Sequence, residues 1–306
     1  MGIKNLYKFI EKYCPEAIQL TKITKYKNKT LGIDFNLMIH KLIYAIRKNG
    51  YDIKNNDKII THIHALILKF KSFKKYNVKP IFVFDGMANK IKYAELEKRN
   101  KIWSELELKY TNAVTEEDKK KYYYLKSRIT EKEFEECREL INIFGYNIID
   151  SKEEADIELV ILEKSGIIDY IVSDDMDILL FGAEILLKKF TTSENKKIQE
   201  INLSVIKKEL GFNQNDLIKL GILLGSDYCD NKPISINKAY KIIKNMETNE
   251  IEKKCKNAIK YFNNANNKTI DKNEIIELEI DKQNIYSFLK KYDYTKEYID
   301  ELVNYF

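Results

Sequence analysis

The chain has 306 residues, of which 33% are charged and 44% hydrophobic, and a formal net charge of +6. This length suffices for one large or two medium domains with a buried core, so neither disulfides nor metals are needed merely to fold. The hydrophobic fraction excludes a disordered tail protein, and no apolar run approaches a membrane span. The first residues, MGIKNLYKFIEKYC, lack the apolar stretch and cleavage site of a signal peptide. We expect a folded protein that is neither secreted nor membrane-embedded.

The basic residues are unevenly divided between lysine and arginine. Of 53 basic residues only Arg47, Arg99, Arg128 and Arg138 are arginines. A small net charge spread over many solvated lysines is weak evidence for any particular partner. Arginine alone offers a rigid, planar fork for phosphate groups, so the arginines are the more informative basic residues.

The cysteines and histidines exclude some kinds of site. The cysteines are Cys14, Cys137, Cys229 and Cys255. They lie far apart and form no C-x-x-C pair, which fits a reducing compartment and argues against zinc. His62 and His64 form an H-x-H pair, but residues two apart on a helix do not share a face, so a packing or surface role is favoured over a metal site. His40 is the one other histidine, so the sequence gives little support for a catalytic triad built on histidine.

Strands and helices alternate along the first part of the chain. Residues 29–34 are predicted to form a strand that ends at Asp34, and a helix follows over 37–48. A second helix over 61–75 carries its apolar residues on one stripe. The run PIFVFDG over 80–86 predicts a buried strand closed by Asp85. The members of the helical stripe are Ile63, Leu66, Ile67, Phe70 and Phe73.

Residues 86–129 differ in character, because they are charged, helical and poor in large aliphatic side chains. We expect two helices that project from the body, with a break near 111–115. A new helix begins at Thr130, where Glu133 completes a T-x-x-E capping box.

The alternation continues with a strand over 146–150, a helix over 153–165 and a strand over 169–177 that runs into an acidic turn. A hairpin is expected over 184–202, and the chain is helical from 203 onward. This order predicts an α/β fold with a mostly parallel central sheet flanked by helices.

Three carboxylate positions share one setting, because each directly follows an apolar strand: Asp34, Asp85 and the pair Asp174 and Asp175. The carboxyl ends of parallel strands form one crevice in an open sheet. Negative charge gathered there is costly unless cations bind it, and oxygen ligands without histidine or cysteine select Mg²⁺ or Mn²⁺. For any single aspartate, a helix N-cap or turn role is the alternative.

Further carboxylates lie near these strands in the sequence. They are Glu154, Asp156, Asp177 and Asp227. A helix N-cap or turn role is a weaker explanation when so many carboxylates occur together. A carboxylate cluster that holds two Mg²⁺ ions is the usual apparatus for phosphodiester hydrolysis.

Six segments, in order, match the motifs of one nuclease family: MGIKNLYKFIEKYCPEAI, GIDFN, VFDG, EEADIE, SDDMDILLFG and LGILLGSDYCD. The chain resembles the flap endonuclease family, the XPG-like structure-specific 5′ nucleases, along nearly its whole length. The resemblance implies a PIN-like 5′ nuclease fold in a single domain over 1–306. Its parts would be a nuclease region over 1–105, a helical arch over 86–129, an internal nuclease region over 130–228, and a degenerate helix–two-turn–helix with C-terminal helices over 229–306.

The resemblance assigns the carboxylates as ligands of two Mg²⁺ ions, with Mn²⁺ as a substitute. One position departs from the family, because Asp156 stands where the family has glutamate. Aspartate is one methylene shorter, so this contact could run through water, and we expect activity to survive. The ligand set is Asp34, Asp85, Glu154, Asp156, Asp175, Asp177 and Asp227.

Two basic residues match the base of the family's arch. Lys92 and Arg99 are seven residues apart and hence on one helical face. The resemblance assigns them contacts with the scissile phosphate, where they would neutralise developing charge. The alternative is that both are solvated charges of a helix rich in glutamate and lysine.

In the family, a single-stranded 5′ flap passes through the arch. Trp103 and the run Tyr122–Tyr124 are available for base contact, and Arg128 is a candidate phosphate contact. Ordinary packing aromatics are the alternative.

Three N-terminal positions also match the family. Gly2 would avoid a clash where the N-terminus threads near the active site. His40 replaces a tyrosine that stacks beside the metals, although a partly buried helix histidine is an equally good interpretation. Arg47 is a further candidate for phosphate binding.

The clearest departure lies at 231–240, where the family has a glycine-rich turn that binds duplex backbone and often K⁺. Pro233 and Ser235 replace the glycines, and close approach of backbone to phosphate usually needs glycine. This calls the K⁺ site into question and predicts weaker or altered duplex binding. Lys238, Lys241 and Lys244 lie at helical spacing and would bind phosphates without reading sequence.

The family often ends in a sliding-clamp motif, Q-x-x-L-x-x-F-F, after a flexible linker. Here the last residues are IDELVNYF, and Ile299 replaces the glutamine. Leu302, Tyr305 and Phe306 keep the intervals, but no linker precedes them, so we favour a last core helix over a clamp-binding tail.

The leading hypothesis is a Mg²⁺-dependent flap endonuclease that acts as a monomer on branched DNA with a 5′ flap, in the nucleus or cytoplasm. A 5′→3′ exonuclease, a junction-cutting relative and a non-catalytic nucleic-acid-binding replication factor remain the alternatives.

Overall fold

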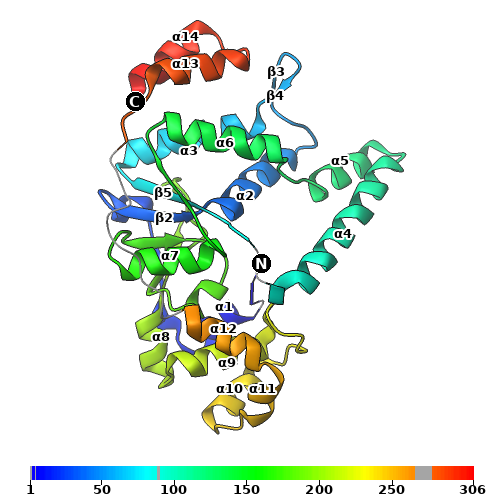
Figure 1. Ribbon diagram of the computed structural model, residues 1–306, viewed down its shortest axis with the longest axis vertical. Coiled ribbons are helices and arrows are strands. Elements are labelled where there is room, and N and C mark those ends of the chain that lie inside the picture. Colours follow the sequence, from blue (N-terminus) through cyan, green and yellow to red (C-terminus); the bar gives the residue numbers. More distant parts are fainter. Residues whose placement is uncertain (1, 4, 88–89, 266–277) are drawn as a thin grey trace.

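The computed structural model describes residues 2–3, 5–87, 90–265 and 278–306. Its centre is a seven-stranded sheet in the order β1–β9–β8–β7–β2–β5–β6 (Figure 1). Neighbours from β8 to β6 pair in parallel, whereas β9 pairs antiparallel with both β8 and β1. This confirms the predicted α/β class and the hairpin within 184–202. The strands are β1 (Ile18–Thr21), β2 (Thr30–Asp34), β5 (Lys79–Phe84), β6 (Asn147–Asp150), β7 (Tyr170–Val172), β8 (Ile185–Lys188) and β9 (Ile198–Asn202), with a separate ribbon of β3 (Lys54–Asn55) and β4 (Lys58–Ile59).

Both faces of the sheet are buried, which explains the unbroken apolar run of β5. Ile81 and Val83 belong to one core cluster, and Phe82 and Phe84 belong to the other. Successive side chains of a strand point to opposite faces, so a strand covered on both sides needs apolar residues at every position.

Helices cover the two faces as separate groups. The first core contains residues of α1 (Leu6–Tyr13), α7 (Ala155–Lys164), α8 (Leu203–Leu210), α9 (Gln214–Gly225), α10 (Ile236–Lys244), α11 (Asn249–Lys254) and α12 (Lys256–Ala265). The second contains residues of α2 (Phe35–Arg47), α3 (Thr61–Tyr76), α6 (Glu131–Ile143), α13 (Lys282–Lys291) and α14 (Lys296–Tyr305). None of the helices in the described ranges has the length and apolar character needed to cross a membrane.

Local sequence signals for these helices are confirmed. The predicted stripe of α3 is buried from Ile63 to Phe73. Thr130 and Glu133 form the expected capping box at the start of α6. Ile299 and Leu302 are buried in α14, so this segment is a core helix, as favoured above.

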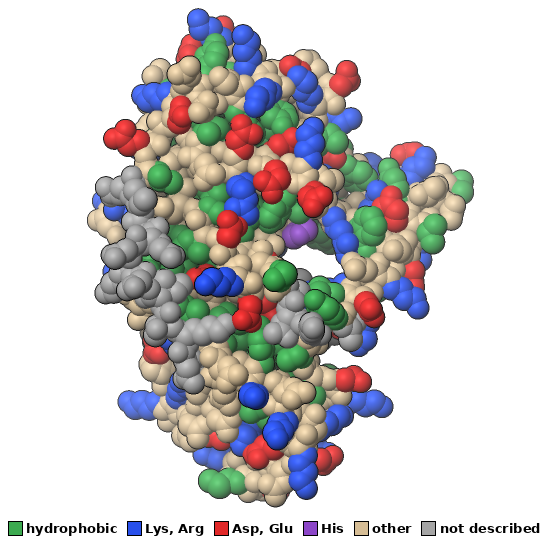
Figure 2. Space-filling view, viewed as in Figure 1, with side chains coloured by type: hydrophobic (Ala, Val, Ile, Leu, Met, Phe, Trp, Pro, Cys, Tyr) green, Lys and Arg blue, Asp and Glu red, His purple; other side chains and the backbone are tan. Residues whose placement is uncertain are grey.

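The arch consists of α4 (Tyr93–Thr111) and α5 (Glu116–Leu125), with the break where it was predicted. The two helices contact one another and project from the body (Figure 1). Figure 2 shows an open gap between this projection and the rest of the molecule. No side chain of α5 is fully buried, which explains why its sequence lacks an apolar stripe.

The expectation of unpaired cysteines is wrong for two of them. Cys229 and Cys255 form a disulfide, with their Cα atoms 5.7 Å apart. They are 26 residues apart in sequence, and the fold brings the loop after α9 against the start of α12. Cys14 and Cys137 are buried free thiols.

Candidate metal-binding active site

The seven predicted carboxylates converge at the carboxyl edge of the sheet. Six of them line one cavity of about 360 Å³, and the seventh, Asp177, is buried beside Asp175, whose Oδ1 accepts the Asp177 backbone N–H at 3.0 Å. The cavity forms here because parallel strands end at the same edge. The six are Asp34 after β2, Asp85 after β5, Glu154 and Asp156 at the start of α7, Asp175 after β7 and Asp227 after α9.

Backbone groups hold two of these side chains. Asp34 caps α2, because its Oδ1 accepts the Leu37 N–H at 3.0 Å, while Oδ2 accepts the Ser173 hydroxyl at 3.0 Å. Asp85 accepts the N–H of Ala155 at 2.9 Å, at the start of α7. Asp34 and Asp85 therefore both bind backbone N–H groups at helix starts and line the cavity.

The carboxylates destabilise one another's ionised forms. Burial, followed by the charge of Asp85, raises the pKa of Asp34 to about 7. Burial and the charge of Asp175 raise the pKa of both Asp156 and Asp177 well above the usual range. Such a cluster is most stable in its ionised form when cations share the site.

The start of the chain reaches into this cluster. The Ile3 N–H donates to Asp177 Oδ1 at 3.1 Å, while Asp177 Oδ2 is buried and has no hydrogen-bond partner among the described residues. A buried carboxylate oxygen without a partner is the expected condition of a cation ligand. Together with the all-oxygen donor set, it fits Mg²⁺ or Mn²⁺.

Two cations reach the carboxylates from the base of the arch. Lys92 pairs with Glu154, and Arg99 Nη2 lies 2.5 Å from Asp227 Oδ2. Burial lowers the pKa of Lys92, but the charges of Glu154, Asp156 and Asp177 outweigh it and raise that pKa. Two of the carboxylates are thus already paired. Within the described ranges, no three acidic, histidine or cysteine side chains have the spacing of a ready metal cage.

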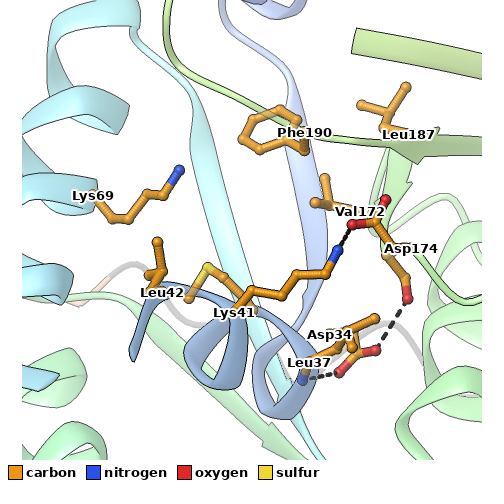
Figure 3. A pocket seen from close by; sticks show the side chains of 11 residues that line it. Asp34, Leu37, Lys41, Leu42, Lys69, Val172, Asp174, Leu187 and Phe190 are labelled. Atoms are coloured by element: carbon orange, nitrogen blue, oxygen red, sulfur yellow. Dashed lines mark hydrogen bonds and ion pairs between the residues drawn. The ribbon is translucent and has the colours of Figure 1, made fainter. Parts of the chain in front are cut away.

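Several residues of the site were missed by the sequence reasoning. Lys41 of α2 pairs with Asp174, and Lys188 Nζ donates to the Asp174 carbonyl at 2.7 Å. Figure 3 shows Lys41 pointing toward Asp174 across a smaller pocket that also includes Asp34. Burial and the charge of Lys188 lower the pKa of Lys41 to about 8. Among so many lysines, no sequence signal distinguishes these two.

Tyr228 is another residue that was missed, although it directly follows Asp227. Its hydroxyl donates to Glu154 Oε2 at 2.6 Å. Lys92 Nζ lies 4.3 Å from the centre of its ring. A tyrosine immediately after a site aspartate could have been noted as a candidate.

The residues expected to contact DNA lie in different surroundings. His40 lines the carboxylate cavity, and Gly2 lies directly against Asp175. Arg128 stacks on Trp103 at 4.8 Å, and Trp103 donates to the Lys126 carbonyl at 2.5 Å. These two side chains therefore also join α4 to the end of α5.

Arg47 lies in the interior, although it was expected to be a phosphate contact. It is 8% exposed, and its guanidinium contacts Asp52, Ser127 and Glu133. Every nitrogen of this fork has a protein partner in the structure, which suits a structural bond better than a phosphate contact.

The substituted turn at 231–240 leads into α10. Ser235 caps this helix, and Pro233 packs against Gly225 at the end of α9. Lys238, Lys241 and Lys244 are exposed, and Lys244 Nζ donates to the Leu210 carbonyl at 3.0 Å.

Known proteins resemble this chain over most of its length. The XPG N-terminal domain matches residues 1–106, and the XPG I-region matches residues 145–227. Flap endonuclease 1 of Homo sapiens is 34% identical over 237 residues, which are 75% of this chain and 62% of that protein. Flap endonuclease 1 of Brugia malayi is 31% identical over 269 residues, 85% of this chain and 71% of that protein.

Among solved structures, the catalytic core of Rad2 in complex with DNA substrate is similar, with a TM-score of 0.70 and 19% identity over 97% of this chain and 98% of that one. A mostly parallel sheet that gathers acidic side chains at one edge, beside a projecting pair of helices, is the arrangement of a 5′ nuclease fold. The chain belongs to the XPG-like flap endonuclease family. It spans about 62% of the length of the human relative.

Proposed function

We propose that this chain is a structure-specific 5′ nuclease that uses Mg²⁺, or Mn²⁺ in its place, to hydrolyse phosphodiester bonds in branched DNA with 5′ single-stranded flaps, in replication, repair or recombination. The observation that carries the proposal is the convergence of the carboxylates and two arch cations on one cavity. The relatives named flap endonuclease 1 and the Rad2 core solved with DNA substrate support it.

The carboxylates would hold two divalent ions. When bound, these ions would supply Lewis acidity at the scissile phosphate and at the attacking water. Lys92 and Arg99 would neutralise charge that develops on the phosphate. Lys92 would first have to leave Glu154, and Arg99 would have to leave Asp227. Both could do so once bound cations compensate the negative charge of the carboxylates.

The gap beneath the arch (Figure 2) would accept a single strand of DNA. His40 would stack near the reacting nucleotide, and Arg128 at the arch base would contact a phosphate of the strand. Arg47 is buried, so it would act only by holding the arch base in place. Lys238, Lys241 and Lys244 on α10 would contact duplex backbone.

The proposal does not include K⁺, because Pro233 and Ser235 stand where a glycine turn would be needed. It also does not include clamp recruitment, because Ile299 and Leu302 are buried in α14. One chain carries the whole carboxylate set, so we propose that it acts as a monomer, in the nucleus or cytoplasm.

A flap substrate labelled at its 5′ end tests the proposal, with Mg²⁺, Mn²⁺ or EDTA. Release of an oligonucleotide indicates an endonuclease, and release of mononucleotides indicates a 5′→3′ exonuclease. Cleavage of a four-way junction, tested as a second substrate, indicates a junction-cutting relative. We expect Asp175→Ala to lower the rate about 1000-fold, equivalent to about 4 kcal/mol of transition-state stabilisation. The control is Asp150→Ala, which removes an exposed carboxylate away from the cavity.

Equal rates for Asp175→Ala and the wild type would show that the metal site is wrongly assigned. No cleavage of flap, nicked or single-stranded substrates by the wild type would favour a non-catalytic replication factor.

A further inference from the structure

Helix α12 (Lys256–Ala265) contributes a side chain to the active site, although it lies outside both segments that match the family. The hydroxyl of Tyr261 lies 3.2 Å from Glu154 Oε1 and 3.2 Å from Glu153 Oε2. Glu154 lines the carboxylate cavity. A residue about 100 positions away in sequence therefore touches one of the site carboxylates.

Two tyrosines hold the two oxygens of Glu154 separately. Tyr228 donates to Oε2 at 2.6 Å. The Tyr261 hydroxyl lies 3.2 Å from Oε1, and its single proton is shared between this oxygen and Glu153 Oε2, which lies at the same distance. The rings of the two tyrosines are 5.5 Å apart. Lys92 also pairs with Oε2, so Tyr261 is the hydroxyl that restrains the other oxygen. A carboxylate held at both oxygens cannot rotate freely, so these three groups together restrain which way Glu154 faces.

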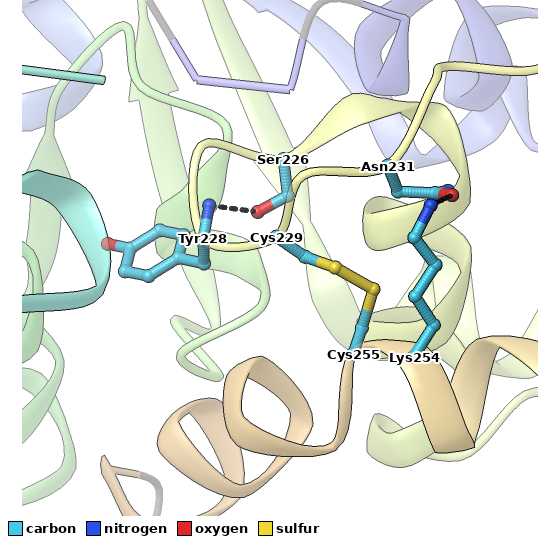
Figure 4. The surroundings of a disulfide bond; sticks show 6 residues. All are labelled: Ser226, Tyr228, Cys229, Asn231, Lys254 and Cys255. Carbon is cyan, nitrogen blue, oxygen red and sulfur yellow. Dashed lines mark hydrogen bonds between the residues drawn. A yellow bond between two sulfur atoms is a disulfide. The ribbon is translucent and has the colours of Figure 1, made fainter. Parts of the chain in front are cut away.

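The position of α12 is itself restrained. Phe262, next to Tyr261, is fully buried in the first core. The Cys229–Cys255 disulfide ties the residue before α12 to the loop that carries Asp227 and Tyr228 (Figure 4). A hydroxyl carried on a helix fixed at both points is suited to orienting another group.

We propose that Tyr261 is a positioning residue, whose hydroxyl orients the Glu154 carboxylate for divalent-cation binding. The proposal rests on the proposed function, because it takes Glu154 to be a cation ligand. Hydrogen-bonding partners of this kind commonly change metal affinity 10- to 100-fold when removed. Since Tyr228 still holds Oε2 in the variant, we expect an effect at the lower end of this range.

The test is Mn²⁺ binding without DNA, measured as free Mn²⁺ by electron paramagnetic resonance during titration of the disulfide-intact protein. Tyr261→Phe keeps the ring and removes the hydroxyl, and we expect it to weaken Mn²⁺ binding about tenfold. The matched control is Tyr26→Phe, which removes a hydroxyl that donates to Glu200 at 2.9 Å in the sheet, away from the cavity. We expect the control to leave Mn²⁺ affinity unchanged.

A double-mutant cycle separates positioning from general destabilisation. If Tyr261 acts through Glu154, Tyr261→Phe has no further effect on Mn²⁺ affinity in a Glu154→Ala background, which removes both carboxylate oxygens. Equal Mn²⁺ affinity of Tyr261→Phe and the wild type overturns the inference and leaves the nuclease proposal intact, as do additive effects in the cycle. A wild type that binds no Mn²⁺ overturns the proposed function, and the inference with it.

Discussion

At Gly2 the N-terminal backbone lies directly against the active site. Its φ is +72°, and a Cβ built there would lie 1.9 Å from Asp175 Oδ1. No side chain fits between the N-terminal backbone and this carboxylate, so either the backbone or Asp175 must move when one is added. Glycine is required here by space as well as by conformation.

We expect Gly2→Ala to lower nuclease activity about 100-fold, because a displacement near 1 Å in an active site has an effect of that order. Steady-state cleavage of a flap substrate measures it. The control is Gly166→Ala, which has a similar φ of +70° but nothing within 4 Å of the added Cβ. Both variants carry the strain of positive φ, so equal losses of activity would refute the steric explanation.

Between the helices, Arg47 joins the arch to the body. It contacts Asp52 at 2.7 Å, Ser127 and the Arg128 carbonyl at 3.0 Å, and Glu133 at 3.2 Å. These partners come from the loop after α2, the segment after α5 and the first turn of α6. One buried guanidinium therefore joins three segments at the base of the arch, beside the contacts of Tyr123 with Asp52 and of Tyr124 with Tyr44.

We expect Arg47→Met to lower the free energy of unfolding by about 3 kcal/mol, because it leaves buried carboxylates without their cation. Urea denaturation measures the change, and faster proteolysis within α4 and α5 would locate it. The control is Arg138→Met, which breaks the pair of a half-buried arginine with the exposed Asp150 and should cost less than about 1 kcal/mol. Equal losses in both variants would show that Arg47 has no special role at the arch base.

Considered as a whole, the molecule combines a small positive net charge with a concentrated acidic centre. Burial and Asp85 raise the pKa of Asp34 to about 7, above its value in an unfolded chain. Between those two values the folded state retains a proton that the unfolded state has lost, so stability falls as pH rises through this window. Without divalent cations, the ionised Asp34 therefore lowers the stability of the folded state most near and above neutral pH.

We expect Asp34→Asn to be more stable than the wild type in EDTA at pH 8, by on the order of 2 kcal/mol, and the difference to vanish near pH 4. Asparagine still caps a helix well, so the capping of α2 is retained. Urea denaturation at a series of pH values measures the difference. Adding Mg²⁺ at pH 8 should stabilise the wild type more than the variant. A difference that does not change with pH would contradict the electrostatic explanation.

Much of this fold could be predicted from the sequence, because its signals are local. Apolar runs that end in Asp34 and Asp85 mark strands, and Thr130 with Glu133 marks a helix start. Parallel strands end at one edge, so the convergence of their carboxylates also followed from the order of the elements. The roles of these residues in catalysis stay predictions.

Other features were decided only by the tertiary structure. Nothing local distinguishes the buried Arg47 from an exposed arginine, Cys229 from a free thiol, or Tyr261 from the many other tyrosines. Apart from Asp52, which is 5 residues from Arg47, their partners lie 26 to 108 residues away. Helix and strand periodicity reports which face of an element is buried, whereas a hydrogen bond or disulfide across the core depends on how whole elements pack.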